Sequence, residues 1–165
     1  MIRVIGLALL ACAGLLCCQS TPPDPNPKFR ELSPEDAKRL DQQRELVLAA
    51  AKQRYGTRSL TRTEKDLPIL QRLIDDKAFK KEQTYELQSL GVVLGDVLAS
   101  QFPLRWVILT DEFGTDPTLR FKKTTVTMNA LTMISKRVER GEHVDVQWLV
   151  DKTREALSDA EQKFR

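Results

Sequence analysis

The sequence has little of the material from which metal sites and nucleophilic catalytic sites are usually built. It contains one histidine, His143, and three cysteines, Cys12, Cys17 and Cys18, which all lie within the first 18 residues. Past those cysteines, zinc would lack most of its usual ligands, and Ser/His/Asp or Cys/His catalysis would have at most one base. We therefore expect no metal and no cofactor, and we expect His143 to be an exposed loop residue.

An excess of charge of one sign is also missing. Lys and Arg number 26, Asp and Glu number 23, and the two signs are mixed along the chain. A surface that binds nucleic acid needs a one-sided accumulation of basic residues. The composition therefore predicts no nucleic-acid partner.

A long apolar run is absent too, but a short one opens the chain. It extends from Val4 to Cys18, follows Arg3 and holds no charged residue. Its fifteen residues are fewer than the roughly 20 that span a bilayer. A basic start, a short apolar segment and an abrupt polar boundary are typical of an export signal. Residues 1–18 are therefore predicted to direct the protein to the periplasmic side of the cell envelope.

Cys18 ends the apolar segment, where the lipidated cysteine of a bacterial lipoprotein signal is found. The residue before it, Cys17, is not the Gly, Ala or Ser usual before the cleavage point. Cys12 follows a better-matching pattern but leaves a short apolar segment. Cys18 is our candidate anchor, with Cys12 and Cys17 as alternatives; cleavage after Ser20 to a free product and an uncleaved anchor stay open. Gln19 after Cys18, rather than Asp, favours the outer membrane as the site of attachment.

The residues after the signal separate into a tether and a domain. Four prolines between Pro22 and Pro27 favour extended polyproline conformation. Residues 19–32 are therefore predicted to form a semi-rigid tether. Residues 33–165 are predicted to form one domain, because a chain of about 150 residues suffices for a single core.

Periodicity and end signals predict an α+β domain with N-terminal helices, a small and mostly antiparallel three-stranded sheet, and two C-terminal helices. Ser33 followed by Pro34 predicts the start of the first helix, and Gly56 its end. Asp66 and Asp145 are expected to cap later helices. The expected helices cover about 33–56, 66–75, 84–101, 129–141 and 145–164, and the strands lie near 104–109, 119–121 and 126–128.

Three sequence blocks in the middle and end of the chain resemble the bacterial domain of unknown function 3806 family. They are Leu90-Gly-Val-Val-Leu-Gly-Asp96, then Trp106 with Asp111-Glu-Phe-Gly114, then Thr132-Met-Ile-Ser-Lys-Arg137 with Gly141-Glu142 and Asp145. The resemblance covers roughly residues 65 to 150. It implies a compact bacterial domain and adds no mechanism, because the family has no assigned activity.

Two glycines, Gly91 and Gly95, lie four residues apart inside the third expected helix. Each weakens a helix interior by about 0.8–1 kcal/mol relative to alanine, so another interaction should offset that cost. We expect a second element, such as the strand that carries Trp106, to pack closely against this helix face. The alternative is a close approach to a ligand, although a phosphate-binding loop places its glycines between a strand and a helix.

The carboxylates Asp96, Asp111 and Asp116 are the candidates for an acidic site. Asp111 and Asp116 lie in a turn, which is more typical of a solvated hairpin than of a calcium loop. Asp96 stands beside the glycine pair, so an inward-facing carboxylate would need a partner. We expect Lys136 or Arg137 to supply that partner.

Lys136, Arg137 and Arg140 form a basic cluster in the last turn of the fourth expected helix. Cations at a helix C-terminus are stabilised by its dipole, which accounts for the cluster without a ligand. The alternative is a contact site for an anion or an acidic partner.

The sequence thus favours an exported, lipid-anchored envelope protein whose domain is a binding or accessory module rather than an enzyme. Its partners would be the membrane, through the N-terminal anchor, and an unidentified envelope protein. The first alternative is a hydrolase that uses two carboxylates about 5–9.5 Å apart. The second is an immunity-type inhibitor, which would present an exposed apolar or strongly charged patch.

Overall fold

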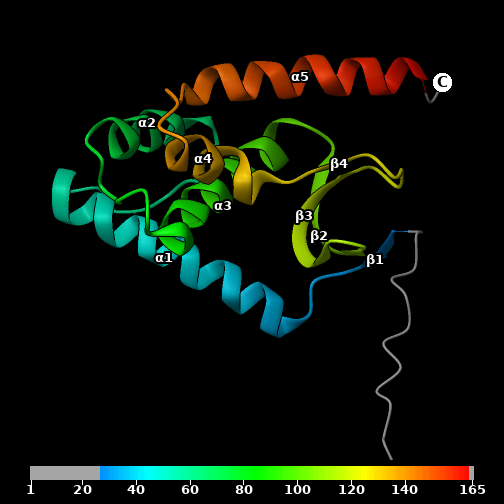
Figure 1. The fold of residues 1–165 in the computed structure, drawn as a ribbon, viewed down its shortest axis with the longest axis horizontal. Coiled ribbons are helices and arrows are strands. Elements are labelled where there is room, and N and C mark those ends of the chain that lie inside the picture. The colour runs from blue at the N-terminus through cyan, green and yellow to red at the C-terminus, as the bar shows by residue number, and fades with distance from the viewer. Residues whose placement is uncertain (1–26, 164–165) are drawn as a thin grey trace, which may run out of the picture.

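The structure is a computed structural model and describes residues 27–163. The predicted export signal, most of the predicted tether and the candidate lipidation sites Cys12, Cys17 and Cys18 lie outside these residues. The described chain is α+β, as the sequence predicted, with five helices and a four-stranded sheet (Figure 1). The elements are β1 (Lys28–Arg30), α1 (Pro34–Tyr55), α2 (Leu67–Asp75), α3 (Thr84–Gln101), β2 (Leu104–Asp111), β3 (Gly114–Phe121), β4 (Thr127–Met128), α4 (Ala130–Glu139) and α5 (Val146–Lys163), with a 3₁₀ turn, η1 (Glu64–Asp66), before α2.

The sheet is antiparallel in the order β1-β2-β3-β4, so it has one strand more than the sequence predicted. The additional strand, β1, lies in the stretch assigned to the tether, where Phe29 pairs with Leu109 of β2. The guanidinium of Arg120 lies 3.9 Å from the centroid of the Phe29 ring. Three residues are too few to show alternation, so this strand is created by its long-range pairing and was invisible to local patterns.

Helix α1 begins and ends where the sequence predicted. The Ser33 hydroxyl accepts a hydrogen bond from the Asp36 amide, and the Asp36 carboxylate accepts one from the Ser33 amide. Pro34 occupies the first turn, and Gly56 ends the helix with φ +70°. This reciprocal capping satisfies amide groups that a helix start otherwise leaves unpaired.

Helix α3 is the centre of the domain. Figure 1 shows α1 on one side of it, α4 and α5 on the other, and the sheet at one end. Residues 89–98 of α3 are all buried, whereas the sequence pattern suggested a single apolar stripe. A helix that is covered on every side is expected to be apolar all round, and α3 fits that rule except at Ser89 and Asp96.

The two glycines of α3 are packing positions, as predicted. A Cβ added at Gly91 would lie less than 3.0 Å from backbone atoms of Ala130 and Leu131 in α4. A Cβ added at Gly95 would overlap the ring of Trp106 in β2. The close approach of α4 and of Trp106 therefore offsets the helix propensity that the glycines lose.

Candidate functional site

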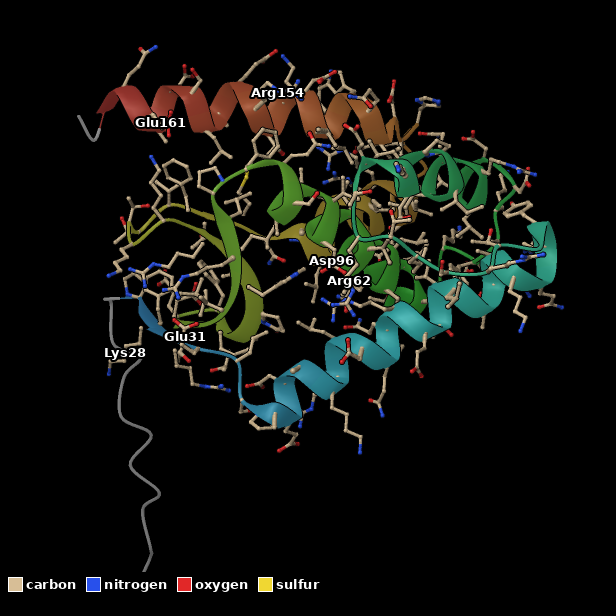
Figure 2. The ribbon with its side chains drawn as sticks, turned by 180° about the vertical axis from the view of Figure 1, so that it is seen from behind. Lys28, Glu31, Arg62, Asp96, Arg154 and Glu161 are labelled. Carbon is tan, nitrogen blue, oxygen red and sulfur yellow. The ribbon has the colours of Figure 1, made fainter. Side chains whose placement is uncertain are left out.

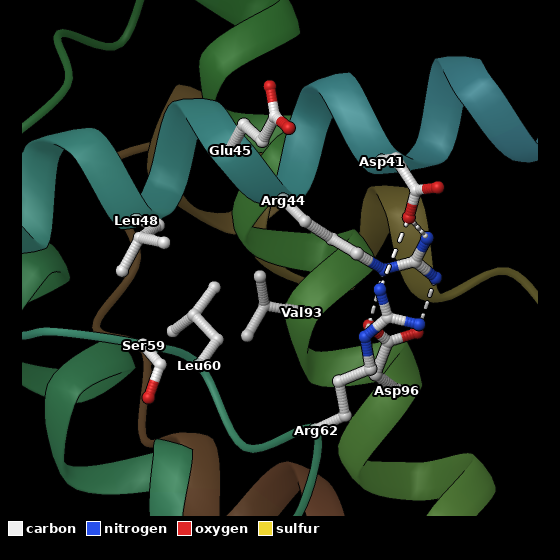
Figure 3. A pocket seen from close by; sticks show the side chains of 9 residues that line it. All are labelled: Asp41, Arg44, Glu45, Leu48, Ser59, Leu60, Arg62, Val93 and Asp96. Carbon is white, nitrogen blue, oxygen red and sulfur yellow. Dashed lines mark hydrogen bonds and ion pairs between the residues drawn. The ribbon is translucent and has the colours of Figure 1, made fainter.

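A cavity of about 320 Å³ opens between α1, the loop 57–63 and α3, and we call it the Asp96 cleft (Figure 3). On α1 its residues recur three and four apart, which places them along one side of that helix. On α3 the two lining residues are three apart and share a face. The cleft is lined by Asp41, Arg44, Glu45, Leu48, Ser59, Leu60, Arg62, Val93 and Asp96.

Asp96 is held by three donors from two elements. Arg44 donates from Nε to Oδ2 at 2.6 Å and from Nη2 to Oδ1 at 2.7 Å, and Trp106 donates from Nε1 to Oδ1 at 3.0 Å. The carboxylate side chain is only 7% exposed. The predicted ion pair of Asp96 therefore exists, but the predicted partners, Lys136 and Arg137, are wrong.

The electrostatics around Arg44 favour its charged form. Burial would lower the pKa of Arg44, but hydrogen bonds and charge attraction from Asp96 and Asp41 outweigh burial and raise that pKa. Arg44 also bonds Asp41 at 2.9 Å, so its guanidinium links two acids. Asp96 is thus used to position Arg44 and Trp106, and it is not a free base.

Arg62 stands at the mouth of the Asp96 cleft because of its backbone conformation. Its φ of 58° is in the left-handed region, which is uncommon for a residue with a side chain. The carboxylate of buried Asp66 accepts hydrogen bonds from the amides of Thr61 and Arg62 at 2.9 and 2.7 Å and fixes this turn. The Arg62 guanidinium then bonds Asp41 at 3.2 Å and lies 4.0 Å from the carboxylate of Asp96 (Figures 2 and 3).

The side chain of Asp66 makes hydrogen bonds other than the capping bond that the sequence predicted. The sequence predicted that it caps α2, and it does occupy the position before that helix, but its side chain makes no capping hydrogen bond there. It turns back to the loop instead, because two amides and the Thr61 hydroxyl are within reach. Asp145, by contrast, caps α5 as predicted, since it accepts from the Trp148 amide at 3.0 Å.

The three candidate acids do not meet in one site. Asp111 and Asp116 line a separate cavity of about 470 Å³ beside the β2–β3 hairpin, together with Lys136. Asp111 accepts a hydrogen bond from the Phe113 amide at 2.8 Å and so stabilises the hairpin turn. Asp96 does not line that cavity, so a pair that includes it is not formed.

The basic cluster at the end of α4 also separates in space. Lys136 lines the hairpin cavity, whereas Arg137 lies 5.9 Å from the ring centroid of Trp148 in α5. Arg140 pairs with Glu142 at 2.7 Å. Arg137 and Arg140 thus contact different neighbours, Lys136 lines a separate cavity, and the three cations do not converge on one anion.

The chemistry available in the Asp96 cleft is that of binding. Two arginines face three carboxylates, and Leu48, Leu60 and Val93 supply an apolar wall. Among residues 27–163, no three His, Cys, Asp or Glu side chains come together as metal ligands. A group that enters this cleft would meet a charged rim on one side and aliphatic side chains on the other.

Sequence reasoning missed Arg44 and Arg62 as the cationic neighbours of Asp96. The signal for Arg44 was its place in α1, between Leu40 and Val47 on the buried face of the helix. A charged residue within an apolar stripe points to a buried partner. Nothing local pointed to Arg62, whose position depends on the turn that Asp66 holds.

Comparison with known proteins gives a family of unknown function and a solved structure of similar fold. Residues 66–149, just over half of the chain, match the model of a family described as "Domain of unknown function (DUF3806)". A crystal structure of a protein from Bacteroides thetaiotaomicron matches with a TM-score of 0.69 at 16% identity, over 77% of this chain and 47% of that one. The chain thus spans about half the length of that protein, and the likeness shows a shared fold. No curated protein matches the sequence.

Proposed function

The chain belongs to the family of the domain of unknown function DUF3806, and we propose that it is an exported, lipid-anchored protein of the bacterial cell envelope. In this proposal the α+β domain is a binding or accessory module and not a catalyst. Its binding surface is the Asp96 cleft, and its partner is another component of the envelope.

The observation that carries the binding role is the state of Asp96. The most buried acid of the cleft already accepts three hydrogen bonds from Arg44 and Trp106. A general base needs a lone pair directed at the substrate proton, and a general acid needs a proton to give. The oxygens of Asp96 are instead engaged with Arg44 and Trp106, and the cleft is suited to recognise a group through its charged rim and aliphatic wall.

The proposed export and membrane attachment of the protein rest on its N-terminal sequence, and the fold is compatible with them. Strand β1 begins at Lys28, one residue after the proline-rich stretch ends at Pro27. A spacer of the nine residues between Cys18 and Lys28 would reach about 28 Å in polyproline conformation, at roughly 3.1 Å per residue. None of the helices in residues 27–163 is both long and apolar enough to cross a membrane.

One observation favours the hydrolase alternative. Asp111 and Asp116 line the same cavity, as two carboxylates of a hydrolytic site would. The use of Asp111 in the hairpin turn gives it a structural role instead. Asp116→Asn should therefore leave the cellular role of the protein intact, whereas a hydrolase would lose it.

Photocrosslinking in cells tests the binding role. A photoreactive residue replaces Ser59, an exposed residue at the rim of the Asp96 cleft, and a matched control replaces Ser158, an exposed serine on α5. We expect one reproducible adduct from position 59 that is absent from position 158 and is lost in an Arg62→Ala background. Equal capture at both positions, or capture that is insensitive to Arg62→Ala, would contradict the proposal.

A further inference from the structure

A second cavity, of about 420 Å³, lies where the first half of α1 and the start of α3 face the sheet, and we call it the glutamine cleft. Gln43 of α1 and Gln88 of α3 both line it. Its walls include the apolar side chains Leu40 and Ile108, and Tyr85 stands at its edge with half of its surface exposed. The glutamine cleft is distinct from the Asp96 cleft, since the two share no lining residue.

Gln43 is the unusual member of this cavity. It is only 6% exposed, and its carboxamide makes no hydrogen bond to any group in the described part of the chain. Yet among the described residues, every side-chain nitrogen or oxygen that is fully shut off from solvent has a partner. The amide atoms of Gln43 must therefore reach solvent, and the solvent-accessible space that this residue lines is the glutamine cleft.

Because the Gln43 amide meets no donor or acceptor in the described part of the chain, its hydrogen bonds are left to whatever fills the cleft, either water or a ligand. The carboxamide of Gln88, on α3, also lacks a partner. Gln88 is half-buried, and no hydrogen bond to its carboxamide is found within residues 27–163. Tyr85 lies three residues before Gln88 on α3, and hence on the same face of that helix. Two unpaired carboxamides and one exposed aromatic ring thus converge on one cavity.

The two arginines that line the glutamine cleft are paired with carboxylates, whereas Asp116 adds an acceptor that has no ion-pair partner among the residues that the structure describes. Arg30 pairs with Asp36, and Arg39 pairs with Glu35 at 2.7 Å, so neither guanidinium is available as a free anion site. A carboxamide both donates and accepts hydrogen bonds. The unsatisfied groups therefore call for a neutral ligand that carries donors and acceptors together with an apolar face.

We propose that the glutamine cleft binds a neutral saccharide of one or two sugar units. Sugar hydroxyls donate and accept, as the carboxamides of Gln43 and Gln88 require, and the C–H face of a sugar ring matches the Tyr85 ring and the aliphatic wall. A volume of about 420 Å³ is within the usual range for a small-ligand site. This inference goes beyond the proposed function, and it depends neither on the lipid anchor nor on the Asp96 cleft.

A peptide is the less suitable ligand for this cavity. An extended peptide gains most of its affinity by adding a strand to a sheet edge. Three β3 residues line the glutamine cleft, Thr115, Asp116 and Pro117, and Pro117 has no N–H to donate to such a strand. A small ring that uses side-chain hydrogen bonds has no need of a free strand edge.

The test is a titration of the purified full chain, followed through the side-chain amide NMR signals of its glutamines. The probes are N-acetylglucosamine, its β-1,4-linked dimer and maltose, with the peptide Gly-Ser-Gly-Ser as the comparison ligand. We expect at least one sugar to shift the Gln43 and Gln88 signals saturably. Gln43→Leu should weaken that binding at least tenfold, because it removes a group that both donates to and accepts from the sugar hydroxyls.

Gln42→Leu is the matched control, since Gln42 is the exposed neighbour of Gln43 on α1 and does not line the cleft. It should leave the binding unchanged. Tyr85→Ala, at an exposed position, should weaken binding without unfolding the protein. The proposal is overturned if none of the three sugars causes a saturable shift, if only the peptide does, or if Gln43→Leu binds the sugar as tightly as the unmodified chain.

Discussion

Arg44 of α1 and Asp96 of α3, 52 residues apart in the chain, form a two-point ion pair at the inner end of the Asp96 cleft. The exposed fraction is 13% for the Arg44 side chain and 7% for that of Asp96. Trp106 donates to the same carboxylate from β2. One carboxylate therefore connects the first helix, the central helix and the sheet.

Replacement of the Arg44 guanidinium by an apolar side chain should lower the free energy of unfolding. Arg44→Leu leaves the buried carboxylate of Asp96 without its main partner, and breaking a buried pair on one side costs about 3–5 kcal/mol in the free energy of unfolding. Because Arg62 lies 4.0 Å away and can partly replace Arg44, we expect about 3 kcal/mol by chemical denaturation.

The double variant Arg44→Leu/Asp96→Asn separates the charge from the packing. The introduced asparagine would be neutral and could still accept from Trp106, so the double variant should be more stable than Arg44→Leu by about 1 kcal/mol or more. If the double variant is the less stable of the two, the cost of Arg44→Leu is not that of an unpaired charge.

Gly95→Ala should destabilise the protein although alanine is the better helix former. The helix gains about 0.8–1 kcal/mol, but the new methyl group overlaps the Trp106 ring, and overpacking of a core costs about 1–3 kcal/mol. We expect a net loss of up to about 2 kcal/mol in the free energy of unfolding, with a weaker Trp106–Asp96 hydrogen bond.

The control for Gly95→Ala is the same substitution in a Trp106→Leu background. A leucine side chain leaves space where the indole ring lay, so the propensity gain should then dominate. Gly95→Ala should become neutral or stabilising there. An unchanged cost in that background would show that Trp106 is not the cause.

Acid should weaken the start of α1. Hydrogen bonds from Arg30, and then from Ser33, lower the pKa of Asp36 well below its usual value. A lowered folded-state pKa stabilises the protein above the unfolded-state pKa of about 3.9, and that stabilisation is lost as the pH falls through the folded-state pKa. Denaturation curves should therefore show a decline in stability below about pH 4 that is smaller in Asp36→Asn.

Glu35→Gln provides the comparison for that measurement. Glu35 is the exposed neighbour of Asp36 in the first turn and pairs with Arg39. This variant should keep the same decline in stability at acid pH as the unmodified chain. An equal flattening by both substitutions would contradict the assignment to the contacts of Asp36 with Ser33 and Arg30.

Cys18→Ala tests the proposed anchor. If the Cys18 thiol carries the lipid, the variant should move from the membrane fraction to the soluble fraction and lose incorporation of labelled fatty acid. Cys12→Ala and Cys17→Ala are the matched controls and should stay in the membrane fraction. A Cys18→Ala protein that remains acylated would transfer the assignment to one of the other two cysteines.

The helix ends were predictable because their signals are local. Ser33 caps α1 through a residue three positions away, Gly56 ends the helix through its own φ, and Asp145 caps α5 within one turn. Periodicity likewise located α3 at 84–101, and the two glycines within it correctly predicted that another element packs closely against this helix. Such features depend on residues within about four positions of each other, so a pattern in the sequence reports them.

The sites were not predictable in the same way. Asp96 plainly needed a partner, but which of several arginines and lysines meets it depends on how α1 docks on α3. Arg62 reaches the Asp96 cleft only because buried Asp66 holds its turn, and β1 exists only because it pairs with β2. Each of these contacts joins elements whose relative position no local pattern states.

By itself the sequence determined the α+β class, the ends of the main helices, the need of Asp96 for a partner and the expectation of export. Those conclusions follow from composition, periodicity and the chemistry of short segments. Only the tertiary structure decided that Arg44 is the partner, that the candidate acids and cations separate, and that the Gln43 carboxamide is left unpaired in a cavity. Ion pairs and unsatisfied groups are properties of packed elements, because burial and distance exist only once the chain has folded.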